Sequence, residues 1–235
     1  MLHITILTLF PEIFPGPLGC SLAGTALKQG LWKLDVLQIR DFTEDKHRTV
    51  DDKPFGGGAG MVMRADILGR AIDHIVAKQP QDKIIYFSPG GTVMSQPQIH
   101  SLKELNHITM ICGRFEGVDE RLIEEYDIQL ISLGDFILSG GEIPALALID
   151  ACVRLIPGVL GSEQTLEEES FSVSGEYAGL LEYPHYTRPS LWKGRAVPEI
   201  LLSGNHLEIK NWRLEKAKEM TKIRRRDLWE QYKQQ

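Results

Sequence analysis

Three glycine-rich stretches are the chemically most suggestive feature of this 235-residue sequence. Each follows a short apolar run, and they span residues 88–91 (SPGG), 112–121 (CGRFEGVDER) and 133–142 (LGDFILSGGE). Glycine lets backbone amides and carbonyls approach a ligand closely, which suits a small polar molecule bound mainly by main chain. Each stretch taken alone could be a tight turn between a strand and a helix. Three of them at one edge of a sheet favour a shared binding pocket.

Charged side chains that could act on a substrate occur in two places. The run of glutamates at 167–169 could be a solvated acidic face, or it could supply a general base. Arg154 ends an otherwise apolar helical stretch, where it could pair with a helix-terminal carbonyl or point a fixed cation at a substrate. Both pairs of alternatives stay open at this level. The sequence has no GxxxxGK[ST] motif, and residues 56–60 do not fit GxGxxG, so a P-loop or Rossmann turn has little support.

The elements around these residues predict an α/β fold with a mostly parallel sheet, because apolar runs of strand length alternate with stretches of helix length. Ligands of such sheets gather at the carboxyl ends of the strands, where the three glycine-rich turns lie. The expected strands cover residues 2–9, 33–39, 84–88, 108–112 and 128–133. The expected helices cover residues 19–29, 65–78 and 143–155.

The composition changes after this α/β region, which we assign to residues 1–160. No Lys or Arg occurs between Arg154 and Arg188, and glutamates gather there among Gly and Ser, so residues 161–185 are predicted to form a flexible linker or lid. Residues 210–235 hold nine Lys or Arg against four Asp or Glu, which predicts that residues 186–235 form a helical domain that binds an anion.

Within that C-terminal domain, two further features are expected. Asn205 should cap a helix that begins at His206, itself more typical of a surface residue than of a catalyst. Trp192, Trp212 and Trp229 are expected to anchor the core.

Charge and cysteine usage limit the class of protein. The 26 basic and 32 acidic residues give a net charge of −6, which argues against a uniformly basic, non-specific nucleic-acid binder. The first apolar stretch lacks a cationic lead-in and is too short for a signal peptide or a membrane span. Cys20, Cys112 and Cys152 form no CxxC pair and lie in apolar sequence, which predicts reduced thiols in a soluble cytoplasmic protein and no structural zinc site.

Taken together, these segments resemble the bacterial tRNA (guanine-N1)-methyltransferases over nearly the whole chain. Strings of this length are far more specific than a short motif. The strings are residues 9–12 (LFPE), 40–43 (RDFT), 47–52 (HRTVDD), 56–60 (GGGAG), 112–117 (CGRFEG), 138–142 (LSGGE), 157–161 (PGVLG), 185–189 (HYTRP) and 202–206 (LSGNH).

The resemblance implies an α/β fold of the SPOUT class with a deep C-terminal trefoil knot, although general rules count against knots. It implies a homodimer with the active site across its interface, and methyl transfer from S-adenosylmethionine to N1 of guanosine 37 in tRNA, next to the anticodon, when another guanosine precedes it. The implied cofactor residues are Tyr86, Ser88, Pro89, Gly113, Glu116, Gly117, Leu133, Gly134, Phe136, Leu138, Gly140, Gly141 and Pro144.

The resemblance also implies a catalytic pair. Guanine N1 carries a proton at neutral pH, so a base must remove it while a cation stabilises charge on O6. Glu169 matches the family's general base and Arg154 the residue that steadies the purine. The family usually has aspartate at the position of Glu169, and about three extra residues follow it here, so Glu168 remains an alternative. Mg²⁺ is a further family requirement, for which this sequence offers no dedicated set of ligands.

The expected macromolecular partner is tRNA, not DNA or a membrane. Phosphate contacts would position the RNA, and a flipped base would be read in a pocket. A SPOUT enzyme for another RNA is the nearest alternative, but it would lack the blocks at 185–188 and 203–206; a non-catalytic RNA-binding module would need no cofactor pocket. The expected tRNA contacts are Arg40, Lys46, Arg48, Gly57, Gly58, Arg188, His206, Arg213, Arg224, Arg225 and Arg226.

Overall fold

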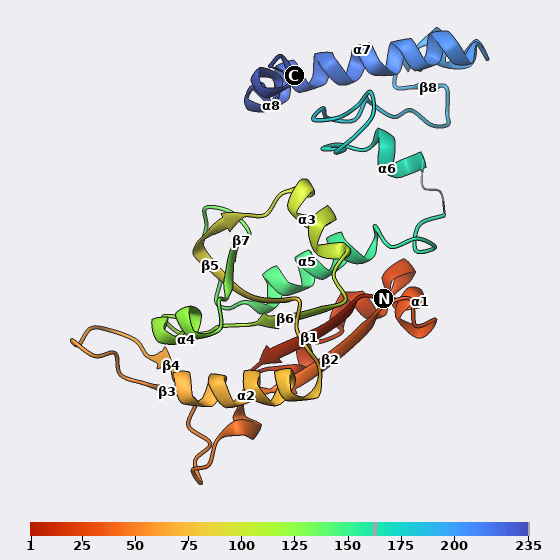
Figure 1. Cartoon of the computed structure of the whole chain (residues 1–235). Coiled ribbons are helices and arrows are strands. Elements are labelled where there is room, and N and C mark those ends of the chain that lie inside the picture. Colours follow the sequence, from red (N-terminus) through yellow and green to blue (C-terminus); the bar gives the residue numbers. More distant parts are fainter. Residues whose placement is uncertain (162–163, 235) are drawn as a thin grey trace. The chain divides into compact units, whose positions relative to one another are not determined.

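The computed structural model describes residues 1–161 and 164–234. The chain divides into two compact units, Met1–Gly161 and Ser162–Gln235 (Figure 1). The first unit holds the three glycine-rich turns, and the second holds the basic C-terminal helices. The division falls next to the predicted boundary at residue 160.

The first unit is built on a five-stranded sheet in which every neighbouring pair is parallel. Its order is β2-β1-β6-β5-β7, so the central strand β6 pairs with β1, which lies about a hundred residues earlier in the sequence. The predicted α/β class with a parallel sheet is confirmed. The strands are β1 (His3–Thr8), β2 (Lys33–Gln38), β5 (Lys83–Val93), β6 (His107–Ile111) and β7 (Gln129–Ser132).

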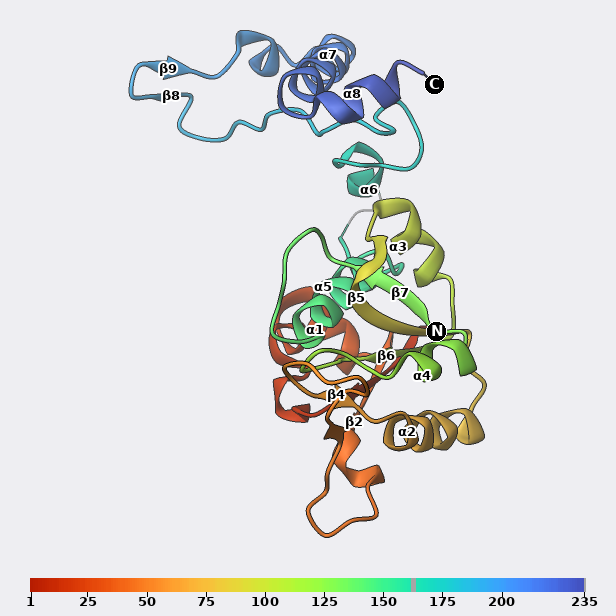
Figure 2. The ribbon, with the colours of Figure 1, turned by 90° about the vertical axis from the view of Figure 1, so that its left-hand side faces the viewer.

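Helices cover both faces of this sheet (Figures 1 and 2). Helices α2 and α4 pack together on one face, and α3 packs with α5 on the other, where α1 also lies. The five helices are α1 (Ser21–Lys28), α2 (Ala65–Lys78), α3 (Gln96–Lys103), α4 (Glu120–Glu125) and α5 (Glu142–Val153). Short 3-10 turns occur at Pro11–Ile13, Gly16–Gly19 and Ile39–Phe42.

Helix α2 shows how the spacing of apolar residues produces a helix that packs against the sheet. Its apolar side chains recur every three or four residues, and those of Ile67, Leu68, Ile72 and Ile75 are buried against the sheet. Burial of each such side chain contributes roughly 1.5–3 kcal/mol. Val76, next to Ile75 in the chain, is 46% exposed because its side chain lies on the other side of the helix. The predicted helix over 65–78 is confirmed.

A two-stranded hairpin extends from the first unit. Strands β3 (Asp51–Asp52) and β4 (Val62–Met63) pair antiparallel, and the glycine-rich residues 56–60 lie in the loop between them. Gly56, Gly57 and Gly58 all have positive φ angles, which other residues rarely adopt.

The second unit has its own small core. Tyr177, Leu180 and Tyr183 pack against Ala217 of α7, and the Thr221 hydroxyl accepts a hydrogen bond from the Leu181 amide at 2.8 Å. Residues 164–185, predicted to be a linker or lid, are therefore part of this compact unit. Its elements are α6 (Gln164–Glu168), β8 (Leu191–Trp192), β9 (Arg195–Ala196), a 3-10 turn at Glu199–Leu202, α7 (His206–Arg224) and α8 (Arg226–Tyr232).

The helix start predicted at His206 is confirmed. Asn205 precedes α7, and its side-chain oxygen accepts a hydrogen bond from the Glu208 amide at 3.3 Å. This bond satisfies one of the amides that the first turn of a helix leaves without a partner.

One expectation about buried residues is wrong. Trp192 is 58% exposed rather than a core anchor, because it lies on the two-residue strand β8 of a hairpin that extends away from α7 and α8 (Figure 2). Trp212 and Trp229 are half-buried, and the fully buried tryptophan is Trp32. All three cysteines are free thiols, as predicted; Cys20 is exposed, whereas Cys112 and Cys152 are buried. Among the described residues, no helix is both long and apolar enough to cross a membrane.

Candidate binding pocket

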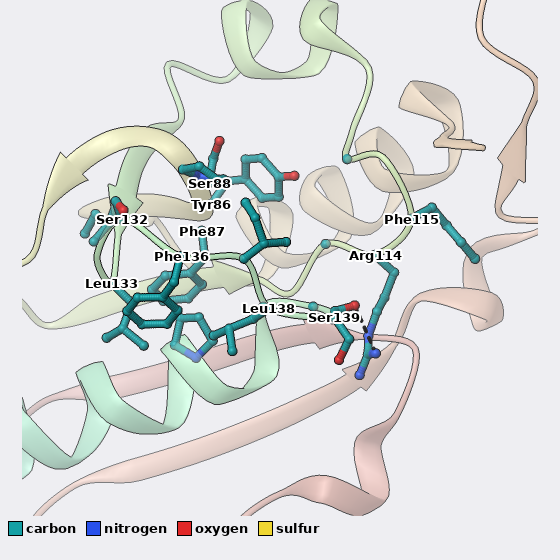
Figure 3. A pocket seen from close by; sticks show the side chains of 18 of the residues that line it. Tyr86, Phe87, Ser88, Arg114, Phe115, Ser132, Leu133, Phe136, Leu138 and Ser139 are labelled. Atoms are coloured by element: carbon teal, nitrogen blue, oxygen red, sulfur yellow. Dashed lines mark hydrogen bonds between the residues drawn. The ribbon is translucent and has the colours of Figure 1, made fainter. Parts of the chain in front are cut away.

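A pocket of about 260 Å³ lies at the carboxyl ends of β5, β6 and β7 (Figure 3). Residues 86–89, 113–117, 131–134 and 136–141 line it, together with Pro144 from the first turn of α5. This is the edge where a parallel α/β sheet binds its ligands. The three glycine-rich turns therefore share one pocket, as predicted from their positions in the sequence.

The first turn is a bulge within strand β5. Phe87 and Thr92 both pair with Ile131 of β7, so residues 88–91 loop out of the ladder between them. Proline cannot donate a ladder hydrogen bond, which explains why Pro89 marks the interruption. A Cβ atom on Gly91 would lie 2.5 Å from the Ile131 amide nitrogen, so only glycine fits where the chain rejoins the sheet.

The second and third turns pack against each other through glycine. The Gly141 amide donates a hydrogen bond to the Gly113 carbonyl at 3.0 Å. A Cβ atom on Gly141 would lie 2.7 Å from the Cα of Cys112, and one on Gly113 would lie 2.5 Å from the Tyr86 ring. Because no side chains separate these turns, their main-chain amides and carbonyls come close to the pocket.

A buried ion pair fixes the same two turns. The Arg114 guanidinium lies 2.9 Å from the Glu142 carboxylate, and Glu142 is only 2% exposed. Thr8 donates to the other carboxylate oxygen at 2.8 Å, and Arg114 donates to the Ser139 carbonyl at 3.2 Å. The guanidinium also lies over the Phe10 ring, 4.5 Å from its centre. Arg114 thus joins the turn after β6 to the turn after β7.

Burial raises the pKa of two ionisable groups near the pocket. It raises the pKa of Tyr86, whose hydroxyl is thus harder to ionise than that of a solvated tyrosine. Burial and the neighbouring Glu142 carboxylate raise the pKa of the Cys112 thiol well above its ordinary value, while Arg114 acts in the opposite direction. Neither group is suited to act as an anionic nucleophile.

All thirteen residues expected to bind a cofactor line this pocket. Sequence reasoning missed the ion pair between Arg114 and Glu142, because nothing in the sequence connects these two residues, which are 28 positions apart. The position of Arg114 between Gly113 and Gly117 is the feature of the sequence that could have indicated its role. The lining residues not expected from the sequence are Phe87, Arg114, Phe115, Ile131, Ser132, Ile137 and Ser139.

The two expected catalytic residues belong to different units. Arg154 follows α5 in the first unit, where it is half-buried and its amide bonds the Asp150 carbonyl at 3.1 Å. Glu169 follows α6 in the second unit and is also half-buried; its carbonyl accepts from the Ser172 amide at 3.2 Å.

The neighbouring carboxylate, Glu168, takes part in the packing of the second unit. It accepts a hydrogen bond from the Tyr183 hydroxyl at 2.6 Å and lies 3.7 Å from the Arg213 guanidinium. Arg213 in turn lies over the Tyr183 ring, 4.8 Å from its centre. Burial, followed by the hydrogen bond to Glu168, raises the pKa of Tyr183. Glu168 therefore anchors the segment that carries Glu169.

The expected tRNA-binding residues also divide between the units. In the first unit, Arg40 and Arg48 hydrogen-bond each other's carbonyls, and Arg48 forms an ion pair with Asp41. In the second unit, Arg225 pairs with Asp227 through two hydrogen bonds. Lys46, Gly57 and Gly58 are exposed in the first unit, and Arg188, His206, Arg224 and Arg226 are exposed in the second.

No group of three or more His, Cys, Asp or Glu side chains arranged to hold a metal ion occurs in residues 1–161 and 164–234.

Comparison with known proteins gives one consistent result. The family model described as tRNA (Guanine-1)-methyltransferase TrmD matches residues 2–231. The chain is 54% identical over 228 residues to a protein of Rhizorhabdus wittichii, which covers 97% of this chain and 91% of that protein. It is 55% identical to a Zymomonas mobilis protein (97% and 90% covered) and 53% identical to a Rickettsia akari protein (97% of each). Each of the three is named tRNA (guanine-N(1)-)-methyltransferase.

Proposed function

The chain belongs to the tRNA (guanine-N1)-methyltransferase family, and from that premise we propose that it methylates N1 of the guanosine just 3′ of the anticodon, with S-adenosylmethionine as donor. Its activity as a tRNA (guanine-N1)-methyltransferase follows from the family; the position of the guanosine, the donor's pocket and the catalytic residues are the proposal. The observation that supports it most is the convergence of three glycine-rich turns on one pocket.

The residues of this pocket fit the proposed donor. The glycine turns bring main-chain donors and acceptors to a polar ligand, while Phe136 and Leu138 offer apolar surface to a purine ring. The volume of about 260 Å³ lies just below the roughly 300–1,000 Å³ typical of small-molecule sites. When bound, S-adenosylmethionine supplies a methyl group that its sulfonium releases to the attacking nitrogen.

The protein's own side chains must prepare that nitrogen. The Glu169 carboxylate accepts the N1 proton, which leaves the electron pair of N1 free to form the new bond to carbon. The Arg154 guanidinium stabilises the negative charge that spreads to O6 of guanine. General-base catalysis of this kind contributes roughly 10²–10⁴-fold to the rate.

The contacts of Glu168 favour Glu169 as the base. Tyr183 donates a hydrogen bond to the Glu168 carboxylate, and the Arg213 guanidinium lies 3.7 Å from it. A base that must reach a guanine would first have to give up both contacts. Glu169, at the next position, leaves this packing intact.

The remaining parts of the proposal concern assembly and partners. We propose a SPOUT fold with a C-terminal trefoil knot and a homodimer whose active site spans the interface. Exposed apolar side chains near the pocket support the dimer, since Phe115, Phe136, Ile137 and Ile143 are each more than half exposed. Residues 161–185 would act as the lid of the active site. The basic side chains of both units would contact the tRNA. The reaction would take place in the cytoplasm, with Mg²⁺ assisting it.

Single-turnover methyl transfer on one tRNA tests the proposal. The product should be N1-methylguanosine, and a transcript with adenosine in place of the target guanosine should not react. Glu169→Gln should lower the rate by roughly 10²-fold or more with unchanged donor binding. Glu168→Gln is the matched control: it should lower the stability of the second unit but keep the rate of the folded enzyme. A near wild-type rate for Glu169→Gln with an inactive Glu168→Gln would assign the base to Glu168.

A further inference from the structure

The exposed Trp192 lies on a hairpin that extends away from α7 and α8 of its own unit (Figure 2). Its side chain is 58% exposed, and that of the preceding Leu191 is 63% exposed. Large aromatic side chains are usually buried, at least in part, so an exposed indole at the end of a hairpin is typical of a contact surface.

The backbone of this hairpin is well defined. Leu191 pairs with Ala196 and Trp192 with Arg195 across a two-residue turn. Lys193 and Gly194 occupy that turn with φ angles of 49° and 75°, the positive values that tight two-residue hairpins require. The indole is therefore held on a short, ordered support.

The hairpin and its flanks are purely basic. Residues 183–198 contain three cations, Arg188, Lys193 and Arg195, and no Asp or Glu, although the whole chain carries a net charge of −6. The Lys193 ammonium lies 5.0 Å from the centre of the Trp192 ring. An aromatic ring and a cation thus lie side by side. Proteins that bind single-stranded nucleic acids use this combination, because the ring stacks on a base and the cation contacts a phosphate.

We infer that Trp192 stacks on an unpaired base of the tRNA substrate, and that Lys193 and Arg195 contact the phosphates beside it. This inference rests on tRNA being the substrate, and it adds a contact that the family resemblance did not assign. The base must be unpaired because bases inside a stem are already stacked on their neighbours. The hairpin would bind RNA of any sequence that offers such a base, since every base has a stacking face.

A second protein chain is the weaker candidate for this surface. A stable protein interface uses about 20–30 residues on each side. The hairpin offers only two large apolar side chains, Leu191 and Trp192, among cations that prefer to stay hydrated. A polyanion with exposed bases satisfies both kinds of side chain at once.

Equilibrium binding of the full-length chain to unmodified tRNA tests the inference. Trp192→Ala should raise the Kd by roughly 5- to 100-fold, because one base loses its stacking partner. Its plot of log Kd against log salt should keep the wild-type slope, because no charge is lost. Arg195→Ala should lower that slope by about 0.7–0.9. Trp192→Phe should keep most of the affinity but lose part of the tRNA-dependent quenching of tryptophan fluorescence.

Leu191→Ala is the matched control, because Leu191 is the adjacent exposed apolar residue and has no ring to stack. Its Kd should equal that of the wild type, and donor binding should be unchanged in every variant. A Trp192→Ala variant that keeps the wild-type fold by circular dichroism and binds within twofold of wild type would overturn the inference. Equal losses of tRNA affinity in Trp192→Ala and Leu191→Ala, accompanied by a change in oligomeric state, would also overturn it. If the wild type itself fails to bind tRNA, the proposed function is at fault instead.

Discussion

Loss of the carboxylate at Glu142 should destabilise the first unit far more than loss of an exposed one. Glu142 is 2% exposed and bonds Arg114 and Thr8, so Glu142→Gln leaves the guanidinium without its counter-charge. Removing one partner of a buried ion pair costs about 3–5 kcal/mol. We expect the lower end, about 3 kcal/mol, because the Arg114 side chain is 21% exposed and can recruit water.

The assay is urea denaturation at pH 7, with thermal unfolding as a second measurement. A loss of about 3 kcal/mol corresponds to a fall in Tm of about 6–12 °C for a chain of this size. Glu44→Gln is the matched control, because Glu44 also faces an arginine, Arg70, at 3.5 Å but is 80% exposed. That exposed pair should be worth about 0–1 kcal/mol.

A double-mutant cycle separates the interaction energy between Arg114 and Glu142 from the other effects of each substitution. Arg114→Gln combined with Glu142→Gln should cost less than the sum of the two single changes, by about 0.5–3 kcal/mol. Additive losses, or a Glu142→Gln variant no less stable than Glu44→Gln, would refute the assignment of this pair as the tie between the two turns. Weaker binding of S-adenosylmethionine by Glu142→Gln, measured by calorimetry on folded protein, would connect the tie to the pocket.

Two further predictions follow from backbone packing and thiol burial. Gly141→Ala should abolish donor binding, because the new Cβ would lie 2.7 Å from the Cys112 Cα, whereas Gly90→Ala should bind like wild type, because its Cβ would meet only the Ser88 hydroxyl at 3.7 Å. Equal calorimetric affinities for the two variants would contradict the packing argument. One thiol, Cys20, should react with a disulfide reagent in the native protein at pH 8, and three after unfolding, because Cys112 and Cys152 are buried and burial raises the pKa of Cys152 to about 12. Cys20→Ser should remove the native reaction.

Local patterns in the sequence determined helix α2 of the first unit and the start of α7 in the second. The apolar spacing over 65–78 predicted α2 with its observed ends, and Asn205 predicted the start of α7. Such features could be predicted because helix periodicity and capping depend on residues within four positions of one another. The family resemblance supplied the thirteen residues expected to bind a cofactor, and the structure brings them to one pocket.

Other features depended on contacts between distant segments. The double pairing of Phe87 and Thr92 with Ile131 lengthened β5 to Lys83–Val93, beyond the predicted 84–88, because a bulge exists only relative to its partner strand. Burial is likewise decided by what packs against a residue. The same side chain type is therefore fully buried at Trp32 and 58% exposed at Trp192.

The sequence by itself thus determined helices α1, α2 and α5, the start of α7, the order of strands and turns along the chain, and the family. Only the tertiary structure decided which turns meet and which charges pair. The bond between Thr8 and Glu142 spans 134 residues, and it forms because parallel pairing brings the ends of β1 and β6 together beside the first turn of α5. No local propensity encodes such a contact, since its free energy depends on the burial and counter-charge that the assembled fold provides.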